Sequence, residues 1–317
     1  MAQCDRVGCF PEMPCALGEA TKEECPHFSG AGDGPGSAVG RDQAGDTVLL
    51  PWTGNSLGTG DMPFVTGRSA ARMVGIVGPQ DAGKTTLLAA WYLLLGRGYA
   101  PAGRSFAGSY TLTGWENIAH SLRWDGTPPA FPAHTTSGSG RVPGQLHLAL
   151  RSGGRIEDYM FADAPGEWFR RWSVSRDAAD AGGARWVEER ADVILLLADQ
   201  SALAGTDRGV ARMVLENLLH RVGAEARSRP VALVWSKADV QVADGIREGL
   251  RETAGRSIPG ITEFLVSVTP PSAEGPDPTG LLALLEWVVT APLARAISRP
   301  EPLSSDDPFH RYGTTSR

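Results

Sequence analysis

The stretch GPQDAGKT, residues 78–85, decides the fold of this chain. It fits the pattern G-x-x-x-x-G-K-[ST], in which glycines let backbone N–H groups wrap a polyphosphate. The apolar run at residues 72–77 before it predicts a buried parallel strand. Residues 85–95 after it predict a helix that stops at Gly96. A strand, a glycine loop and a helix N-terminus together form an anion site, so we expect a bound nucleoside triphosphate.

Lysine usage argues against a chance match to this pattern. The chain has three lysines, Lys22, Lys84 and Lys237, and one of them stands at the required position. By position, Lys84 is expected to bind the β- and γ-phosphates and Thr85 to bind Mg²⁺. The remaining predicted contacts of the loop with the nucleotide are Gly78, Asp81, Ala82, Gly83 and Thr86.

Composition limits the possible classes of protein. The chain has 317 residues, a hydrophobic fraction of 42% and a net charge of -6. A chain of this kind can form a substantial core, and its charge gives no general attraction to nucleic acid or to anionic membranes. No apolar run approaches the length of a membrane span, and the N-terminus lacks the layout of a signal peptide. We therefore expect a cytoplasmic protein.

The cysteines gather at the N-terminus. Cys4, Cys9, Cys15 and Cys25 are all the cysteines of the chain, and His27 follows them closely. In a reducing compartment such clustering favours a metal over disulfides, and four thiolates can complete a tetrahedral Zn²⁺ site. The spacing contains no C-x-x-C pair, so the alternative is a loose segment whose cysteines bind nothing. A site closed by four protein ligands would be structural and not catalytic.

The rest of the chain divides by composition. Residues 1–28 hold the cysteines, and residues 29–45 form a linker rich in Gly and Ser. Residues 46–70 are predicted to be an extended lead-in that packs on the main domain. That domain is expected to span residues 71–295, and a flexible tail covers residues 296–317.

The region after the first helix resembles an insertion. Residues 115–124 have apolar positions at helical spacing, and residues 126–144 read as a loop rich in Pro, Gly, Ser and Thr. Residues 145–151 alternate strictly and predict a strand at the edge of the sheet. His147 in this run is expected to be a strand side chain and not a catalyst.

A second motif follows the next strand. The apolar residues 159–162 lead into DAPGE, residues 163–167. A D-x-x-G sequence after a strand is typical of GTP hydrolases, in which the carboxylate holds the Mg²⁺ shell and the glycine N–H reaches the γ-phosphate. These roles fall on Asp163 and Gly166. Taken alone the motif is weak, because Asp and Gly are also ordinary turn residues.

Three further strands alternate with helices. The strands are predicted at residues 191–199, 231–235 and 264–269, and the helices at about 208–220 and 280–294. Together these elements predict a doubly wound α/β domain. Its sheet is mostly parallel with one antiparallel strand, and its ligand lies at the carboxyl ends of the strands.

A third motif, SKAD at residues 236–239, identifies the base. Guanine presents adjacent N1–H and N2–H₂ donors that one carboxylate, Asp239, can accept together, whereas adenine has an acceptor at N1. The stem of Lys237 is expected to lie along the purine face. Ser236 departs from the [NT]-K-x-D pattern of GTP-binding domains. Ser267 lies in a segment that either contacts the guanine carbonyl through its backbone or forms an ordinary turn.

These motifs together resemble the Ras-like GTPase domain of the translation-factor-related class. More narrowly, the chain is similar to the bacterial double-GTPase group, through residues 106–112, 134–137 and 163–170 and through the cysteines ahead of the domain. The resemblance covers residues 46–295. It implies a Mg²⁺-dependent GTPase, and either a partner GTPase of similar type or an effector encoded nearby.

The resemblance also assigns a switch threonine that closes on Mg²⁺. Thr135 and Thr136 lie just upstream of the predicted antiparallel strand, and Thr136 is the catalytic candidate. Thr111 and Thr113 are the alternatives.

The residue that positions water is open. Glu167 stands where this superfamily commonly has Gln, and its carboxylate either orients water or repels the γ-phosphate. Gln80 resembles the loop glutamine of dynamin-like GTPases. Asp81 occupies the position of Asn in GTPases activated by K⁺, so a bound K⁺ is one hypothesis and a solvated loop carboxylate is the other.

Three arginines follow the second motif, at Arg170, Arg171 and Arg176. They either act in trans on a partner or form a solvated basic face. The sequence therefore predicts a GTPase switch that is slow alone and faster with a partner. The alternative is a GTP- or GDP-binding scaffold with negligible hydrolysis, which Glu167 supports. An ATPase is a third possibility, against which Asp239 argues.

Overall fold

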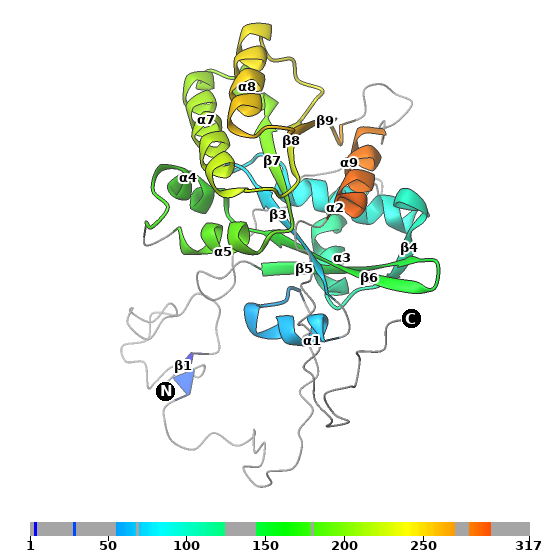
Figure 1. Cartoon of the computed structure of the whole chain (residues 1–317). Helices are drawn as coiled ribbons and strands as arrows, with labels where there is room; N and C mark the ends of the chain where they lie inside the picture. Colours follow the sequence, from blue (N-terminus) through cyan, green and yellow to red (C-terminus); the bar gives the residue numbers. More distant parts are fainter. Residues whose placement is uncertain are drawn as a thin grey trace, which may run out of the picture. The chain divides into compact units, whose positions relative to one another are not determined.

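The computed structural model describes residues 3–4, 28–29, 55–67, 70–123, 144–178, 181–269 and 279–292 (Figure 1). The chain divides into two compact units, Met1–Leu49 and Leu50–Arg317. In the first unit, β1 (Gln3–Cys4) pairs antiparallel with β2 (Phe28–Ser29). The side chain of Cys4 and the residues Cys9, Cys15 and Cys25 lie outside the described part, so the zinc site stays a prediction.

Within the described residues, a seven-stranded sheet forms the centre of the second unit, in the order β4-β5-β6-β3-β7-β8-β9. The strands are β3 (Arg72–Val77), β4 (Ser105–Gly108), β5 (Gly144–Ser152), β6 (Arg155–Asp163), β7 (Val193–Asp199), β8 (Val231–Ser236) and β9 (Thr262–Val266). Strand β5 runs antiparallel to both of its neighbours, and the pairs from β6 to β9 are parallel. This confirms the predicted mostly parallel sheet with one antiparallel strand.

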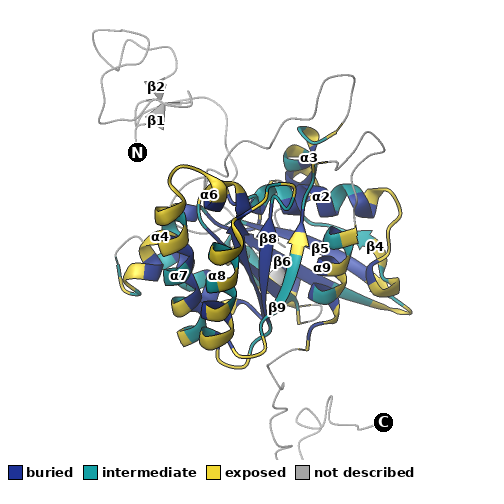
Figure 2. Cartoon of the chain, turned by 90° about the horizontal axis from the view of Figure 1, so that it is seen from above, coloured by how far each residue is buried: buried dark blue, intermediate teal, exposed yellow. Residues whose placement is uncertain are grey.

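Helices cover both faces of the sheet (Figure 2). One face carries α4 (Gly166–Val174), α5 (Gly182–Arg190), α7 (Arg208–Glu225) and α8 (Asp244–Ser257), and the other carries α2 (Lys84–Gly96), α3 (Leu112–His120) and α9 (Thr279–Thr290). Short helices are α1 (Met62–Thr66) and α6 (Gln200–Ala204), with 3-10 turns at η2 (Thr59–Asp61) and η3 (Pro101–Gly103). None of the described helices combines the length and the apolar character that crossing a membrane requires.

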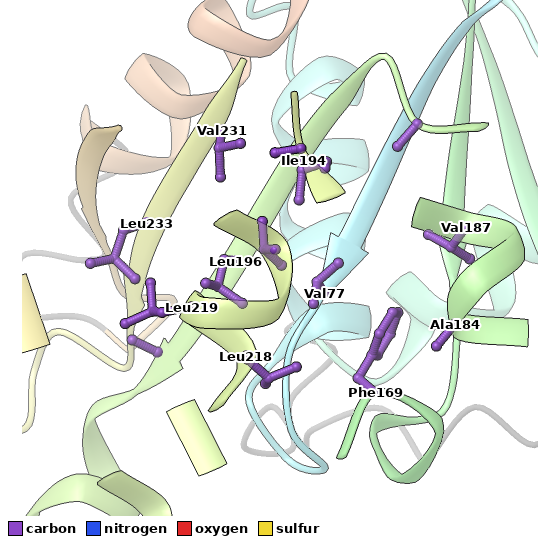
Figure 3. Packing of buried hydrophobic residues seen from close by; sticks show 14 of the residues in the cluster. Val77, Phe169, Ala184, Val187, Ile194, Leu196, Leu218, Leu219, Val231 and Leu233 are labelled. Carbon is purple, nitrogen blue, oxygen red and sulfur yellow. The ribbon is translucent and has the colours of Figure 1, made fainter. Parts of the chain in front are cut away.

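The burial of the central strands explains why their positions could be predicted from the sequence. Every residue of β7 and β8 is buried. A strand that is covered on both faces needs apolar side chains at consecutive positions, and these two runs have them. Figure 3 shows Ile194, Leu196 and Leu233 of these strands packing with Leu218 and Leu219 of α7 on one face.

The edge of the sheet differs from the prediction. Strand β5 is not at the edge, because β4 pairs with it from the outside, with Phe106 opposite Leu150. Strand β4 has four residues, and the side chain of Phe106 is 44% exposed. A strand this short leaves too few alternating positions for a period of two to be recognised.

The helices also depart from the predicted boundaries. Helix α3 begins at Leu112 instead of residue 115. Its Trp115 anchors it to β5, because the indole Nε1 donates to the carbonyl of His147 (2.7 Å). Helices α4, α5 and α8 were not predicted. In α8 the buried residues are Leu250, Thr253 and Ala254, so this helix has almost no apolar stripe to recognise.

The segment ahead of β3 packs into the second unit. Leu57 exchanges two backbone hydrogen bonds with Gln145 of β5 (2.9 and 3.1 Å), and its side chain is fully buried. On the other side of this segment lies Gly114 of α3. A Cβ atom at residue 114 would lie 1.8 Å from the carbonyl oxygen of Asn55. Residues 55–57 are therefore held between α3 and β5 in a space that has no room for a side chain at residue 114.

Replacing Gly114 tests this packing. We expect Gly114→Ala to lower the free energy of unfolding by about 1–3 kcal/mol, because backbone must move to admit the methyl group. Gly245 in α8 is a matched control, since a Cβ there meets nothing within 4 Å. Gly245→Ala should leave stability unchanged or raise it by up to about 1 kcal/mol. Urea unfolding of both variants makes the comparison, and equal effects would contradict the packing.

Candidate functional site

The described residues line a cavity of about 1040 Å³ at the carboxyl ends of the parallel strands. The loops that follow β3, β6, β8 and β9 all contribute to it. The predicted site residues that line it are Gln80, Asp81, Ala82, Gly83, Lys84, Thr85, Thr86, Asp163, Gly166, Glu167, Ser236, Lys237, Asp239 and Ser267. The structure therefore brings the three motifs of the sequence together around one space.

One described residue of the predicted nucleotide site, Gly78, is not among those lining the cavity. Gly78 lies behind the loop, where an added Cβ would be 3.1 Å from Cβ of Leu197 in β7. Thr135 and Thr136 lie outside the described residues.

The phosphate loop owes its shape to residues with left-handed backbone. Asp81 has φ 60° and Gly83 has φ 84°. A glycine adopts this conformation at little cost. For Asp81 it is sterically unfavourable, but less so than for a larger residue, because its short polar side chain can form local hydrogen bonds. Left-handed residues within a turn make a concavity of backbone N–H groups that suits an anion, and α2 begins directly after Gly83.

Lys84 sits at the floor of this loop. Its side chain is buried, and Nζ donates to the carbonyls of Pro79 (2.8 Å) and Gly78 (3.3 Å). Burial lowers the pKa of Lys84, and the attraction of nearby carboxylates offsets part of that shift. Those carboxylates are Asp163, Asp81 and Glu167, in decreasing order of strength. An anion bound beside this ammonium would further favour its charged form.

Two oxygen-bearing side chains meet beside the lysine. The hydroxyl of Thr85, in the first turn of α2, donates to Oδ2 of Asp163 at the end of β6 (2.7 Å). Hydroxyl and carboxylate oxygens are the ligands that Mg²⁺ prefers, and Mg²⁺ usually takes few protein ligands together with phosphate oxygens and water. The pair fits a Mg²⁺ ion that is shared with a nucleotide. Among the described residues there is no cluster of three or more His, Cys, Asp or Glu that could hold a metal without a nucleotide.

The second motif touches the first through a glycine. A Cβ atom at residue 166 would lie 2.1 Å from the backbone nitrogen of Gln80 and 2.4 Å from the carbonyl carbon of Pro79. The backbone at the start of α4 therefore packs directly on the phosphate loop. Glu167, the next residue, lies in the first turn of α4 and lines the cavity.

The third motif lines the same cavity. The hydroxyl of Ser267 donates to Oδ1 of Asp239 (2.6 Å), and the amide of Ala238 donates to the carbonyl of Val266 (3.1 Å). The hydroxyl of Ser236 donates to the carbonyl of Ala198 (3.2 Å). Ser236, the departure from the usual motif, thus ties the loop to β7 through its side chain.

Asp199 and Ser201 beside the cavity were not predicted: Asp199 ends β7, and Ser201 lies in α6, which follows it. Ser201 lines the cavity, and Oδ2 of Asp199 accepts from Nζ of Lys237 (2.8 Å). An acidic residue that ends an apolar strand was available as a signal, because Asp163 ends β6 in the same way.

The alternative switch threonines are placed away from the lining of the cavity. Thr111 is fully buried, and its hydroxyl accepts the amide hydrogen of His147 in β5 (2.8 Å). Neither Thr111 nor Thr113 lines the cavity. His147 is a buried strand residue whose Nδ1 accepts from the amide of Tyr110 (3.0 Å), and its Nε2 lies 3.0 Å from Oδ1 of Asp158.

The fold and the cavity define a P-loop nucleotide-binding domain of the GTPase class. Residues 72–288 match the family described as Double-GTPase 2. The chain belongs to this family. A search of curated proteins gave no match.

A comparison with solved structures also found similar chains. One is the signal recognition particle receptor SRb-GTP/SRX complex from Chaetomium thermophilum, with 18% identity and a TM-score of 0.38 over 69% of this chain and 98% of that chain. A second is Era in complex with MgGDPNP and a segment of 16S ribosomal RNA, with 16% identity and a TM-score of 0.34 over 73% of this chain and 60% of that chain. A variant of Aquifex aeolicus Era bound to GDP and AlF4⁻ shares 19% identity, with a TM-score of 0.33 over 70% of this chain and 57% of that chain.

The contact between Gly166 and the phosphate loop can be tested by adding one methyl group. We expect Gly166→Ala to weaken binding of a nucleoside triphosphate at least about tenfold, because the methyl group must displace the loop backbone or α4. Gly182→Ala is the control, since a Cβ at residue 182 meets nothing within 4 Å. Calorimetric titration with GTP measures both variants. Wild-type affinity in Gly166→Ala would contradict the close contact.

Proposed function

We propose that this protein binds GTP with Mg²⁺ and hydrolyses it to GDP and phosphate as a molecular switch, slowly alone and faster with a partner. The observation that carries the proposal is the meeting of three loops in one cavity. Lys84, the Thr85–Asp163 pair and Asp239 all line this cavity. Membership of a GTPase family supports the same reaction.

Guanine selection rests on Asp239. A carboxylate can accept from N1–H and N2–H₂ of guanine at once, and it would face the N1 lone pair of adenine. Ser267, directly after β9, donates to one oxygen of this carboxylate and holds it in place (2.6 Å). We therefore assign the nucleotide as GTP or GDP, with the stem of Lys237 along the purine face.

Catalysis in this proposal depends on electrostatics and positioning, because little covalent chemistry is asked of the protein. Lys84 binds the β- and γ-phosphates, and the backbone at Gly166 contacts the γ-phosphate. Thr85 and Asp163 would hold Mg²⁺, which would supply positive charge to neutralise the phosphates. Thr135 or Thr136 completes the Mg²⁺ shell, and Thr136 is our candidate.

We assign the positioning of the hydrolytic water to Gln80, Asp81 and Glu167, which all line the cavity. Gln80 orients the water in this proposal, and Asp81 is a candidate ligand for K⁺. A scaffold that binds GTP without hydrolysing it is the second candidate function. The observation that favours it is Glu167, whose carboxylate lines the cavity where the γ-phosphate would add negative charge.

The arginines after the second motif are candidates for contact with a partner, which we propose to be a protein and, by resemblance, a second GTPase. Arg176 forms ion pairs with Glu225 (3.1 Å) and Glu189 (3.4 Å). Exposed pairs of this kind are worth about 0–1 kcal/mol, so a partner can displace them at little cost.

We also propose that the cysteines bind Zn²⁺ as a structural site, and purified protein free of zinc would refute this.

Release of phosphate from GTP tests the proposed function directly. The full chain is incubated with Mg²⁺ and GTP in potassium and in sodium buffers, and with EDTA in place of Mg²⁺. We expect measurable turnover with Mg²⁺ that is lost with EDTA. Faster turnover in potassium would support the K⁺ site. Firm GTP binding without turnover in every buffer would support the scaffold.

The role of Asp239 predicts a change of base preference. In Asp239→Asn the side chain can no longer accept two hydrogen bonds from guanine, but its amide can donate to the oxygen at C2 of xanthine. We expect GTP affinity to fall by about 100-fold or more and XTP affinity to rise. Asp244→Asn, in the first turn of α8, is the control for charge alone. Unchanged GTP affinity in Asp239→Asn would refute the assignment.

The charge of Glu167 predicts how the protein distinguishes GTP from GDP. We expect Glu167→Gln to favour GTP over GDP by about tenfold relative to wild type, because GTP brings the extra negative charge to this carboxylate. Glu216→Gln, which removes a half-buried carboxylate of α7 that pairs with Arg212 and does not line the cavity, is the control. If the ratio of the dissociation constants for GTP and GDP were the same in Glu167→Gln as in the wild type, Glu167 would lie away from the γ-phosphate.

A further inference from the structure

Asp199 lies just behind the loop that is proposed to hold the base. It is the last residue of β7, and it pairs in the sheet with Ser236, the last residue of β8. Its side chain is buried, at 5% exposure, and its carboxylate points to two different elements. Oδ2 accepts from Nζ of Lys237 (2.8 Å), and Oδ1 accepts from the amides of Ser201 (2.9 Å) and Ala202 (3.3 Å).

The two oxygens of this carboxylate have separate partners. Oδ1 caps the first turn of α6, which a neutral amide oxygen can do as well as a carboxylate oxygen. Oδ2 pairs with a charged ammonium, and this contact depends on the negative charge. The two contacts can therefore be separated by experiment.

Lys237 is held in an unusual way for a lysine. Its backbone has φ 54°, in the left-handed region that non-glycine residues seldom occupy. Its side chain lines the cavity at 36% exposure, yet its ammonium is anchored to a buried carboxylate. A lysine side chain has four rotatable bonds and is costly to immobilise, so an anchored end determines where its methylene stem lies.

The loop around Lys237 is fixed from both flanks. On one side, Ser267 holds Asp239 (2.6 Å), and Val266 accepts from the amide of Ala238 (3.1 Å). On the other side, the end of β7 holds Ser236 through Ala198 (3.2 Å) and Lys237 through Asp199 (2.8 Å). Each flank thus positions one of the two side chains proposed to contact the base.

We propose that Asp199 is a positioning residue for the nucleotide base. It fixes the ammonium of Lys237, so that the methylene stem of this lysine lies ready as a wall of the purine site. This inference rests on the proposed function, because it assumes that a guanine nucleotide occupies the cavity. Preorganisation of this kind improves affinity by removing the cost of ordering the side chain on binding.

The test is a double-mutant cycle on the full chain with Asp199→Asn and Lys237→Met. Asn keeps an oxygen for the cap of α6 and removes the charge from the contact with Lys237. We expect Asp199→Asn to weaken GTP and GDP equally, by about tenfold, because the base and not the γ-phosphate is affected. In the Lys237→Met background, Asp199→Asn should cause no further loss.

Glu263→Gln is the matched control. Glu263 of β9 accepts from Arg251 (2.9 Å) and from the indole of Trp235 (3.0 Å), is more exposed than Asp199, and does not line the cavity. This variant should bind GTP like the wild type. Melting temperatures of all variants exclude unfolding as the cause of lost affinity.

The outcomes are distinguishable. Wild-type affinity in Asp199→Asn, or an equal loss in both backgrounds, would overturn the positioning role and leave the proposed function intact. If Asp199→Asn does not fold, Lys237→Met by itself decides, since the inference requires it to lose about tenfold in affinity for both nucleotides. A wild-type protein that binds no guanine nucleotide would overturn the proposed function, and this inference with it.

Discussion

The site depends on the register of the parallel strands. Parallel strands end at the same edge of a sheet, so the loops that leave their carboxyl ends are brought together. Asp163 at the end of β6 pairs with Ile76 of β3, and Ser236 at the end of β8 pairs with both Asp199 of β7 and Val266 of β9. The three motifs are far apart in sequence and meet because these strand ends are aligned.

Two close contacts join the elements around the cavity. Gly166 lies against the phosphate loop with no room for a Cβ atom, and the hydroxyl of Thr85 reaches the carboxylate of Asp163 (2.7 Å). The first contact couples α4 to the loop, and the second couples α2 to β6. If the charge of the anion bound at the loop changed, the loop backbone could shift and displace α4 through the contact at Gly166. A switch requires this kind of coupling between a bound ligand and a helix.

The central strands could be predicted from the sequence because burial on both faces leaves a continuous apolar run, as in residues 193–199 of β7. The motif loops could be predicted because each carries its characteristic residues directly after such a run. The short edge strand β4 and the polar helix α8 leave no such pattern, which is why they were missed. Asp199 was missed for another reason. Its position at the end of an apolar strand marks it as a candidate, but its partner Lys237 is 38 residues away, and no local pattern encodes that contact.

Nucleotide selectivity tests the central claim most directly. Dissociation constants of GTP and ATP are measured for the full chain in Mg²⁺ buffer by competition against one fluorescent guanine nucleotide. The account predicts that GTP binds at least about 100-fold more tightly than ATP, because Asp239 pairs with guanine and is left unpaired by adenine. Equal dissociation constants for the two nucleotides would contradict it.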